Sequence, residues 1–259
     1  MIRTDFQHLL IREENGVLTI TMNRPEVLNA FNETMIRELT AVLDEAVADE
    51  GVRCVVLTGA GRAFGSGQDL HAFDPPKLQE WLDGYHHVVE TIRAMPKPVI
   101  AAVHGVTTGV SCNIALSCDL RIAADNLRFI EVFARIGVVP DGGGGYFLPR
   151  LVGMSKALEL VMLSDEVTGA EAERIGLVNR CVPLSEFEAT VKALAERLAS
   201  GPTLAYSLIK QLMYPSFEID LKTSLQLERN LQGIAVVSHD HHEGVIAFVQ
   251  KRKAHYTGR

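Results

Sequence analysis

Alternating apolar and polar positions predict a strand near the N-terminus. In residues 17–22 the side chains of Leu18, Ile20 and Met22 fall on one face, the spacing of a half-buried strand. Pro25 ends this pattern, and Asn32 is placed to cap a helix. The helix has apolar residues at i, i+3 and i+4 spacing: Met35, Ile36, Leu39, Val42, Leu43, Ala46 and Val47.

Further along the chain, short apolar runs alternate with helical patterns. Residues 54–57 and 98–103 have the apolar character of strands buried on both faces, and residues 119–123 are predicted as a further strand. Helical patterns are predicted at residues 78–94 and 110–117, which makes the fold class α/β.

After about residue 150 the pattern becomes mostly helical. Thr168 and Ser185 each precede a glutamate by three residues, the signature of a capping box, and Gly201-Pro202 separates two helices. We therefore expect an α/β core over residues 1–195 and a helical C-terminal region over residues 196–259.

Composition excludes several classes of protein. The chain has 259 residues, of which 47% are hydrophobic and 22% charged, the usage of an ordinary globular protein. Its net charge of −7 leaves no basic surface typical of nucleic-acid or anionic-membrane binding, although a small basic pocket for a phosphorylated ligand remains compatible with it. Four scattered cysteines, no apolar leader and no long apolar run predict a cytoplasmic protein with no membrane partner.

Three glycine-rich loops are candidates for chemistry: residues 59–70, 104–111 and 140–145. The first two follow predicted buried strands, so their backbone N–H groups can converge on one ligand oxygen. Tight turns explain these two loops about equally well, and Asp141 in the third has the alternative role of a helix cap. Dinucleotide-binding, P-loop and esterase-elbow motifs are absent. The histidine-rich residues 239–243 are better explained as a solvated helix start than as a metal site, and no metal is expected.

Six ordered motifs resemble the enoyl-CoA hydratase/isomerase (crotonase) family over nearly the whole chain. They are residues 23–25 with 28–31 (NRP, LNAF), 57–64 with 67–70 (LTGAGRAF, GQDL), 97–105 (KPVIAAVHG), 118–123 (CDLRIA), 176–178 (GLV) and 243–248 with 251–252 (EGVIAF, KR). The resemblance implies a crotonase-like spiral of ββα units with a C-terminal helical trimerisation region. It also implies a homotrimer or homohexamer.

The resemblance further implies an acyl-CoA thioester substrate and no separate cofactor, since CoA is part of the substrate. Backbone N–H groups of Ser66 and Val110 are expected to hold the thioester oxygen. The substrate-binding and CoA-binding residues implied are Arg24, Ala63, Phe64, Gln68, Asp69, Leu70, Gly109, Asn113, Phe133 and Lys251.

Departures from the family pattern favour isomerisation over hydration. The two glutamates that a hydratase of this family uses are replaced here by Asn113 and Phe133, neither of which can accept a proton at neutral pH. Residues 129–143 instead resemble the ring-1,2-epoxyphenylacetyl-CoA and Δ3,Δ2-enoyl-CoA isomerases, which implies that Asp141 is the catalytic acid–base. A hydratase with an atypical site and a non-catalytic acyl-CoA-binding subunit remain the alternatives.

The ionisation of Asp141 depends on two opposing effects. The start of the following helix lowers the pKa of a nearby carboxyl, whereas burial among apolar neighbours such as Phe133, Val138 and Val139 raises it. The sequence leaves open which effect is larger.

Overall fold

The computed structural model describes residues 2–259 and contains two sheets. The larger has the order β1 (Leu9–Glu14), β2 (Val17–Met22), β3 (Cys54–Gly59), β5 (Val99–Val103), β7 (Leu120–Ala124) and β10 (Arg180–Val182). The smaller has the order β4 (Ala63–Gly65), β6 (Val106–Thr108), β8 (Arg128–Ile130) and β9 (Val167–Thr168). The helices are α1 (Glu33–Ala48), α2 (Leu78–Ala94), α3 (Val110–Ser117), α4 (Gly144–Val152), α5 (Met154–Leu163), α6 (Gly169–Arg174), α7 (Leu184–Ala199), α8 (Thr203–Met213), α9 (Leu221–Val236) and α10 (His239–Val249).

A repeated strand–strand–helix unit builds both sheets together. β3 enters the large sheet, β4 follows in the small sheet, and α2 returns the chain; β5, β6 and α3 repeat this path, as do β7, β8 and α4. Each repeat adds a parallel strand to both sheets, so the chain advances as a spiral. The expected crotonase-like spiral is therefore confirmed.

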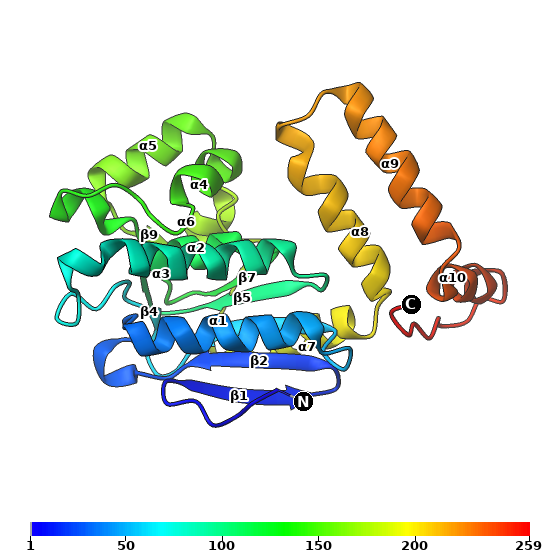
Figure 1. Ribbon diagram of the computed structural model, residues 1–259, viewed down its shortest axis with the longest axis horizontal. Coiled ribbons are helices and arrows are strands. Elements are labelled where there is room, and N and C mark those ends of the chain that lie inside the picture. The colour runs from blue at the N-terminus through cyan, green and yellow to red at the C-terminus, as the bar shows by residue number, and fades with distance from the viewer. Residues whose placement is uncertain (1) are drawn as a thin grey trace.

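Alternation along the strands divides the core between the two faces of the large sheet. Leu18, Val55 and Val99 point to the face covered by α1, α2 and α3. Their neighbours in the strands, such as Val56, point to the opposite face, where α7 packs. Figure 1 shows α1 and α2 lying side by side along the sheet.

Helix starts follow the predicted caps with one exception. Asn32 accepts the Met35 N–H at 2.9 Å, and Thr168 accepts the Glu171 N–H, so both caps are confirmed. The Ser185 cap is wrong: α7 begins at Leu184, where the N–H donates to Asp125 from a distant segment at 3.0 Å. A tertiary hydrogen bond has replaced the local one.

Helices α8–α10 extend away from the core as an arm (Figure 1). The arm begins after Gly201-Pro202, and the expected boundary after residue 195 falls inside α7. Lys210 anchors α8 by an ion pair with Asp119 at 2.9 Å and by hydrogen bonds to two core carbonyls. Within residues 2–259, every helix is too short or too polar to span a bilayer.

Candidate active site

Three parallel strands of the small sheet end at one edge, and the candidate site lies there. β4, β6 and β8 are neighbours in that order and run in the same direction. The segments that follow them contain Gln68, Val110 and Glu131, respectively. In α/β proteins, ligands bind just beyond the carboxyl ends of parallel strands because several loops converge there.

Among residues 66–69 of the loop after β4, one backbone donor is free. The N–H groups of the other residues are used: Ser66 donates to Leu28 O at 2.9 Å, Gly67 to Ser111 Oγ at 3.0 Å, and Asp69 to Phe31 O at 2.9 Å. The N–H of Gln68 has no acceptor among residues 2–259. The prediction that Ser66 supplies an oxyanion donor is therefore wrong, and Gln68 is the residue in this loop that can do so.

The loop after β6 has its free donor in the equivalent place. Gly109 donates its N–H to Ile130 O at 3.1 Å, and Val110 begins α3. The first N–H groups of a helix have no acceptor within the helix, so the Val110 N–H is available to a ligand, as the prediction requires. In both loops the free donor directly follows a glycine with positive φ, +88° at Gly67 and +57° at Gly109.

Close backbone contact holds the two loops together. The Thr108 hydroxyl donates to Ser66 O at 2.8 Å. A Cβ added to Gly67 would lie 3.0 Å from Thr108 O and 3.7 Å from the Gly109 Cα. The two loops are therefore too close here to accommodate a side chain at position 67. This contact fixes the positions of the Gln68 and Val110 N–H groups relative to each other.

Asp141 lies beside the second donor, in the loop before α4. The residue after it, Gly142, packs on Val110: a Cβ added to Gly142 would lie 3.0 Å from Val110 Cγ2. The Asp141 Oδ1 atom is buried and has no hydrogen-bond partner, and the side chain does not cap α4. An unpartnered carboxylate oxygen in a buried place is available to a substrate, because buried polar groups are otherwise almost always bonded.

Burial decides the ionisation of Asp141. It raises the pKa of this carboxyl from 3.8 to about 6, against a smaller lowering by a backbone hydrogen bond. Val138 and Val139 are exposed, so among the neighbours named from sequence only Phe133 belongs to the buried surroundings. A carboxylate of this kind is a stronger base than an exposed aspartate and remains mostly ionised near neutral pH.

Asn113 and Phe133 are both buried, and neither supplies an acid–base group. The Asn113 side-chain amide donates to the Asp141 carbonyl at 2.8 Å, so it positions the loop that carries the carboxylate. Gly144 leaves room for this amide, since an added Cβ would lie 2.5 Å from Asn113 Nδ2.

The structure places the other predicted binding residues as follows, and their contact with a substrate stays a prediction. Arg24 contacts Ala30 O at 2.6 Å and Asp69 at 3.1 Å, and these bonds tie the loop after β2 to the loop after β4. The side chains of Ala63 and Phe64 are fully buried, while Leu70 is exposed. Lys251 follows α10, which lies across the molecule from β4 and α3, so a single chain does not bring it to the candidate site (Figure 1).

Sequence reasoning missed two residues near Asp141. Glu131 directly follows β8 and is 1% exposed, and Tyr85 on α2 is also fully buried. The local sequence shows only that Glu131 is an acidic residue directly after an apolar strand segment. This pattern is typical of a surface turn, so it does not indicate a buried residue.

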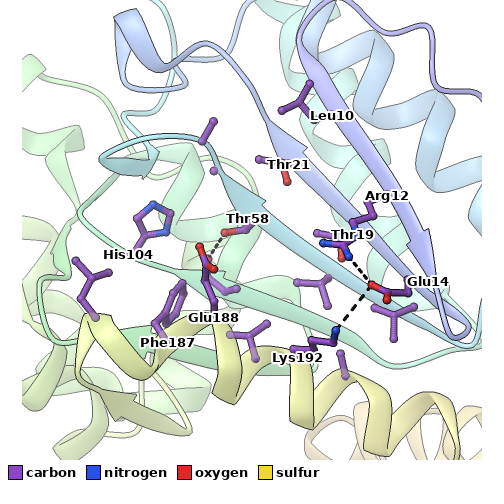
Figure 2. A pocket seen from close by; sticks show the side chains of 18 of the residues that line it. Leu10, Arg12, Glu14, Thr19, Thr21, Thr58, His104, Phe187, Glu188 and Lys192 are labelled. Atoms are coloured by element: carbon purple, nitrogen blue, oxygen red, sulfur yellow. Dashed lines mark hydrogen bonds and ion pairs between the residues drawn. The ribbon is translucent and has the colours of Figure 1, made fainter.

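A groove of about 820 Å³ lies on the opposite face of the large sheet, against α7. Figure 2 shows Arg12, Glu14 and Lys192 turned toward one another there, and both basic groups pair with Glu14. This groove contains none of the free donors or Asp141, so it is not the candidate active site. Among residues 2–259, no cluster of three or more side chains is suited to hold a metal ion.

Comparisons with known proteins identify relatives of this chain. Residues 12–259 match the family model for enoyl-CoA hydratase/isomerase. The chain is 42% identical to a protein of Rhodobacter capsulatus named "Probable enoyl-CoA hydratase" (94% of this chain, 95% of that one). It is 38% identical to the 1,2-epoxyphenylacetyl-CoA isomerase of Escherichia coli (98% and 99%). The crystal structure of an enoyl-CoA hydratase from Bacillus anthracis superposes with a TM-score of 0.94 at 30% identity, covering 98% of this chain and 100% of that one.

Proposed function

The chain belongs to the enoyl-CoA hydratase/isomerase family, and from that premise we propose that it is an acyl-CoA isomerase with Asp141 as its acid–base group. One observation carries the proposal: Asp141 has a buried, unpartnered carboxylate oxygen and directly precedes Gly142, which packs on Val110, while Asn113 and Phe133 cannot titrate. The site therefore has a base and an oxyanion-binding element in one place.

The reaction follows from these groups. Asp141 takes a proton from the α-carbon of a 3-enoyl thioester, and the electron pair moves onto the thioester oxygen. The N–H groups of Gln68 and Val110 stabilise the resulting enolate, where the developing charge makes such donors most effective. Asp141 then returns the proton to the γ-carbon, and the double bond moves into conjugation with the carbonyl. The same proton is removed and replaced, so no other reactant is needed.

The raised pKa of Asp141 supports this role. A base is most useful when its pKa lies just below the working pH, because it is then ionised and still strong. With a pKa of about 6, Asp141 meets both conditions near neutral pH.

Hydration is the second candidate, since relatives include a short-chain-enoyl-CoA hydratase of Clostridium acetobutylicum, 35% identical over 96% of this chain. In that case Asp141 and Asn113 would hold the attacking water. Asn113 already donates its amide to a backbone carbonyl, which leaves its Oδ1 as the atom available to water.

An assay with paired substrates separates these functions. The purified protein is given 3-enoyl-CoA and crotonyl-CoA, and the absorbance of the conjugated thioester is followed. Isomerisation makes the signal of the first rise, whereas hydration makes that of the second fall. Binding of both thioesters without a change in either would instead favour a non-catalytic acyl-CoA-binding subunit and contradict the isomerase.

The arm supports self-association into a homotrimer or homohexamer. Phe248 is 84% exposed, and Phe217, Leu221, Val237 and Val249 are also largely exposed. Exposed apolar side chains along the arm favour burial against another chain, and a second copy supplies the same apolar arm. Light scattering coupled to gel filtration tests the proposal, and a monomer at micromolar concentration would contradict it.

A further inference from the structure

Two polar side chains beside Asp141 have no partner in the fold and no role in the proposed reaction. Both carboxyl oxygens of Glu131 are buried without a hydrogen bond, as is the Tyr85 hydroxyl. Leaving a buried polar group unsatisfied is costly, so each such group in a folded protein needs an explanation.

Glu131 lies in the same row as the two free backbone donors. It directly follows β8, the strand next to β6, at the edge where Gln68 and Val110 also lie. Its two neighbours in sequence contact the loop after β6, which carries the Val110 donor. Ile130 O accepts the Gly109 N–H, and Val132 Cγ2 would lie 3.4 Å from a Cβ added to Gly109. Glu131 is therefore part of the site edge and not of a remote core.

Tyr85 reaches the site from α2. Its ring packs edge to face on Phe31, with 5.9 Å between ring centroids. The Phe31 N–H donates to Gly67 O, and the Phe31 carbonyl accepts the Asp69 N–H. Phe31 is therefore hydrogen-bonded to both sequence neighbours of Gln68. Tyr85 thus lies behind the loop after β4. The negative charge of Asp141 contributes to raising the pKa of both the Tyr85 hydroxyl and the Glu131 carboxyl.

We propose that Glu131 and Tyr85 form the polar end of the acyl pocket and bind an oxygen atom carried by the acyl group, so that the substrate is an oxygen-bearing acyl-CoA and not a plain hydrocarbon acyl-CoA. A hydrocarbon chain would leave the polar atoms of both side chains without hydrogen-bond partners. A hydroxyl, keto or ether oxygen beyond the thioester satisfies them. This inference specifies the substrate class of the proposed isomerase and rests on that function.

The ionisation of both groups fits donation to such an oxygen. Burial, followed by the charge of Asp141, raises the pKa of Glu131 from 4.5 to about 8, so it is protonated at neutral pH. The same two causes raise the pKa of Tyr85. Each group then presents an O–H, and a protonated carboxyl and a phenol both donate to an acceptor oxygen.

Binding of unreactive thioesters tests the inference without requiring turnover. Phenylacetyl-CoA is compared by calorimetry with its ortho-, meta- and para-hydroxy derivatives, which differ only by one oxygen. We expect the wild type to bind at least one derivative about tenfold more tightly than phenylacetyl-CoA, the value of one well-made hydrogen bond in a dry site. Equal affinity for all four thioesters would overturn the inference.

Variants assign the preference to the two side chains. Glu131→Met and Tyr85→Phe should each reduce the preference to about twofold or less, while Glu131→Gln, which keeps a donor, should retain part of it. Glu90→Gln, on the exposed side of α2, is the matched control and should retain all of it. A preference that survives both Glu131→Met and Tyr85→Phe would also refute the assignment.

The outcome is separable from the proposed function. Loss of turnover in Asp141→Asn tests the isomerase, whereas the affinity ratio tests the polar end of the pocket. A protein that prefers the oxygenated thioesters but isomerises none of them would retain the inference and refute the isomerase. Thermal melting of each variant shows whether it is folded. The comparison of the affinities of the wild-type protein for the four thioesters does not depend on any variant.

Discussion

The pH dependence of turnover is the sharpest consequence of the buried carboxylate. With a pKa of about 6, Asp141 is about 90% ionised at pH 7 and about 10% ionised at pH 5. If its carboxylate is the base, kcat/KM for a 3-enoyl-CoA should fall about tenfold between these values. An exposed aspartate with a pKa near 3.8 would remain more than about 90% ionised at both, so the rate would hardly change.

Asp141→Asn supplies the matching perturbation. The amide has nearly the same shape but cannot accept the proton, so we expect a loss of about 10²–10⁴ in kcat. The assay follows formation of the conjugated thioester from about pH 5 to about pH 8, with binding of hexanoyl-CoA as the control for folding and CoA recognition. A flat profile in the wild type, or an Asn variant that keeps more than about a tenth of the rate, would refute the assignment of the base.

Four further predictions address the donors, the loops, the buried acid and the arm. Val110→Pro should lower kcat about 10²–10³-fold with little loss of folding, because proline is tolerated at the first position of a helix but has no N–H; steady-state kinetics and circular dichroism check this. Gly67→Ala should lower both stability and turnover, since its φ of +88° is strained for alanine and the added Cβ lies 3.0 Å from Thr108 O; an unchanged melting temperature would contradict this. Glu131 keeps a proton in the folded state that the unfolded chain releases, so stability should fall as pH rises from about 4.5 to about 8, and Glu131→Gln should flatten this decline in melting temperature between about pH 6.5 and pH 8. Phe248→Glu should shift the mass measured by light scattering toward the monomer, because it places a charge where an exposed phenylalanine would be buried between arms.

Local periodicity predicted four strands of the large sheet and several helices, but no strand of the small sheet. The strand over residues 17–22 and the helix capped by Asn32 depend on spacing that the sequence displays directly, and both were predicted correctly. The role of Asp141 as acid–base stays a prediction, whereas its alternative role as the cap of α4 is wrong, because the helix is capped at Gly143 without a side-chain hydrogen bond.

The site depended on contacts that no local pattern contains. Ser66 and Gln68 are close in one loop, yet only Gln68 keeps a free N–H, because Leu28 from another segment accepts the hydrogen bond of Ser66. The same holds for the start of α7, where Asp125 replaced the predicted Ser185 cap.

Burial of titratable groups was likewise decided by tertiary structure. Glu131 has the appearance of a turn residue in the sequence, but the parallel alignment of β6 and β8 places it inside, beside the oxyanion loop. Sequence by itself therefore determined four strands of the large sheet, several helices and the type of residue available for chemistry. Only the packing of distant segments decided which hydrogen-bonding groups remain free and which acids lose their solvent, because both depend on neighbours that are remote along the chain.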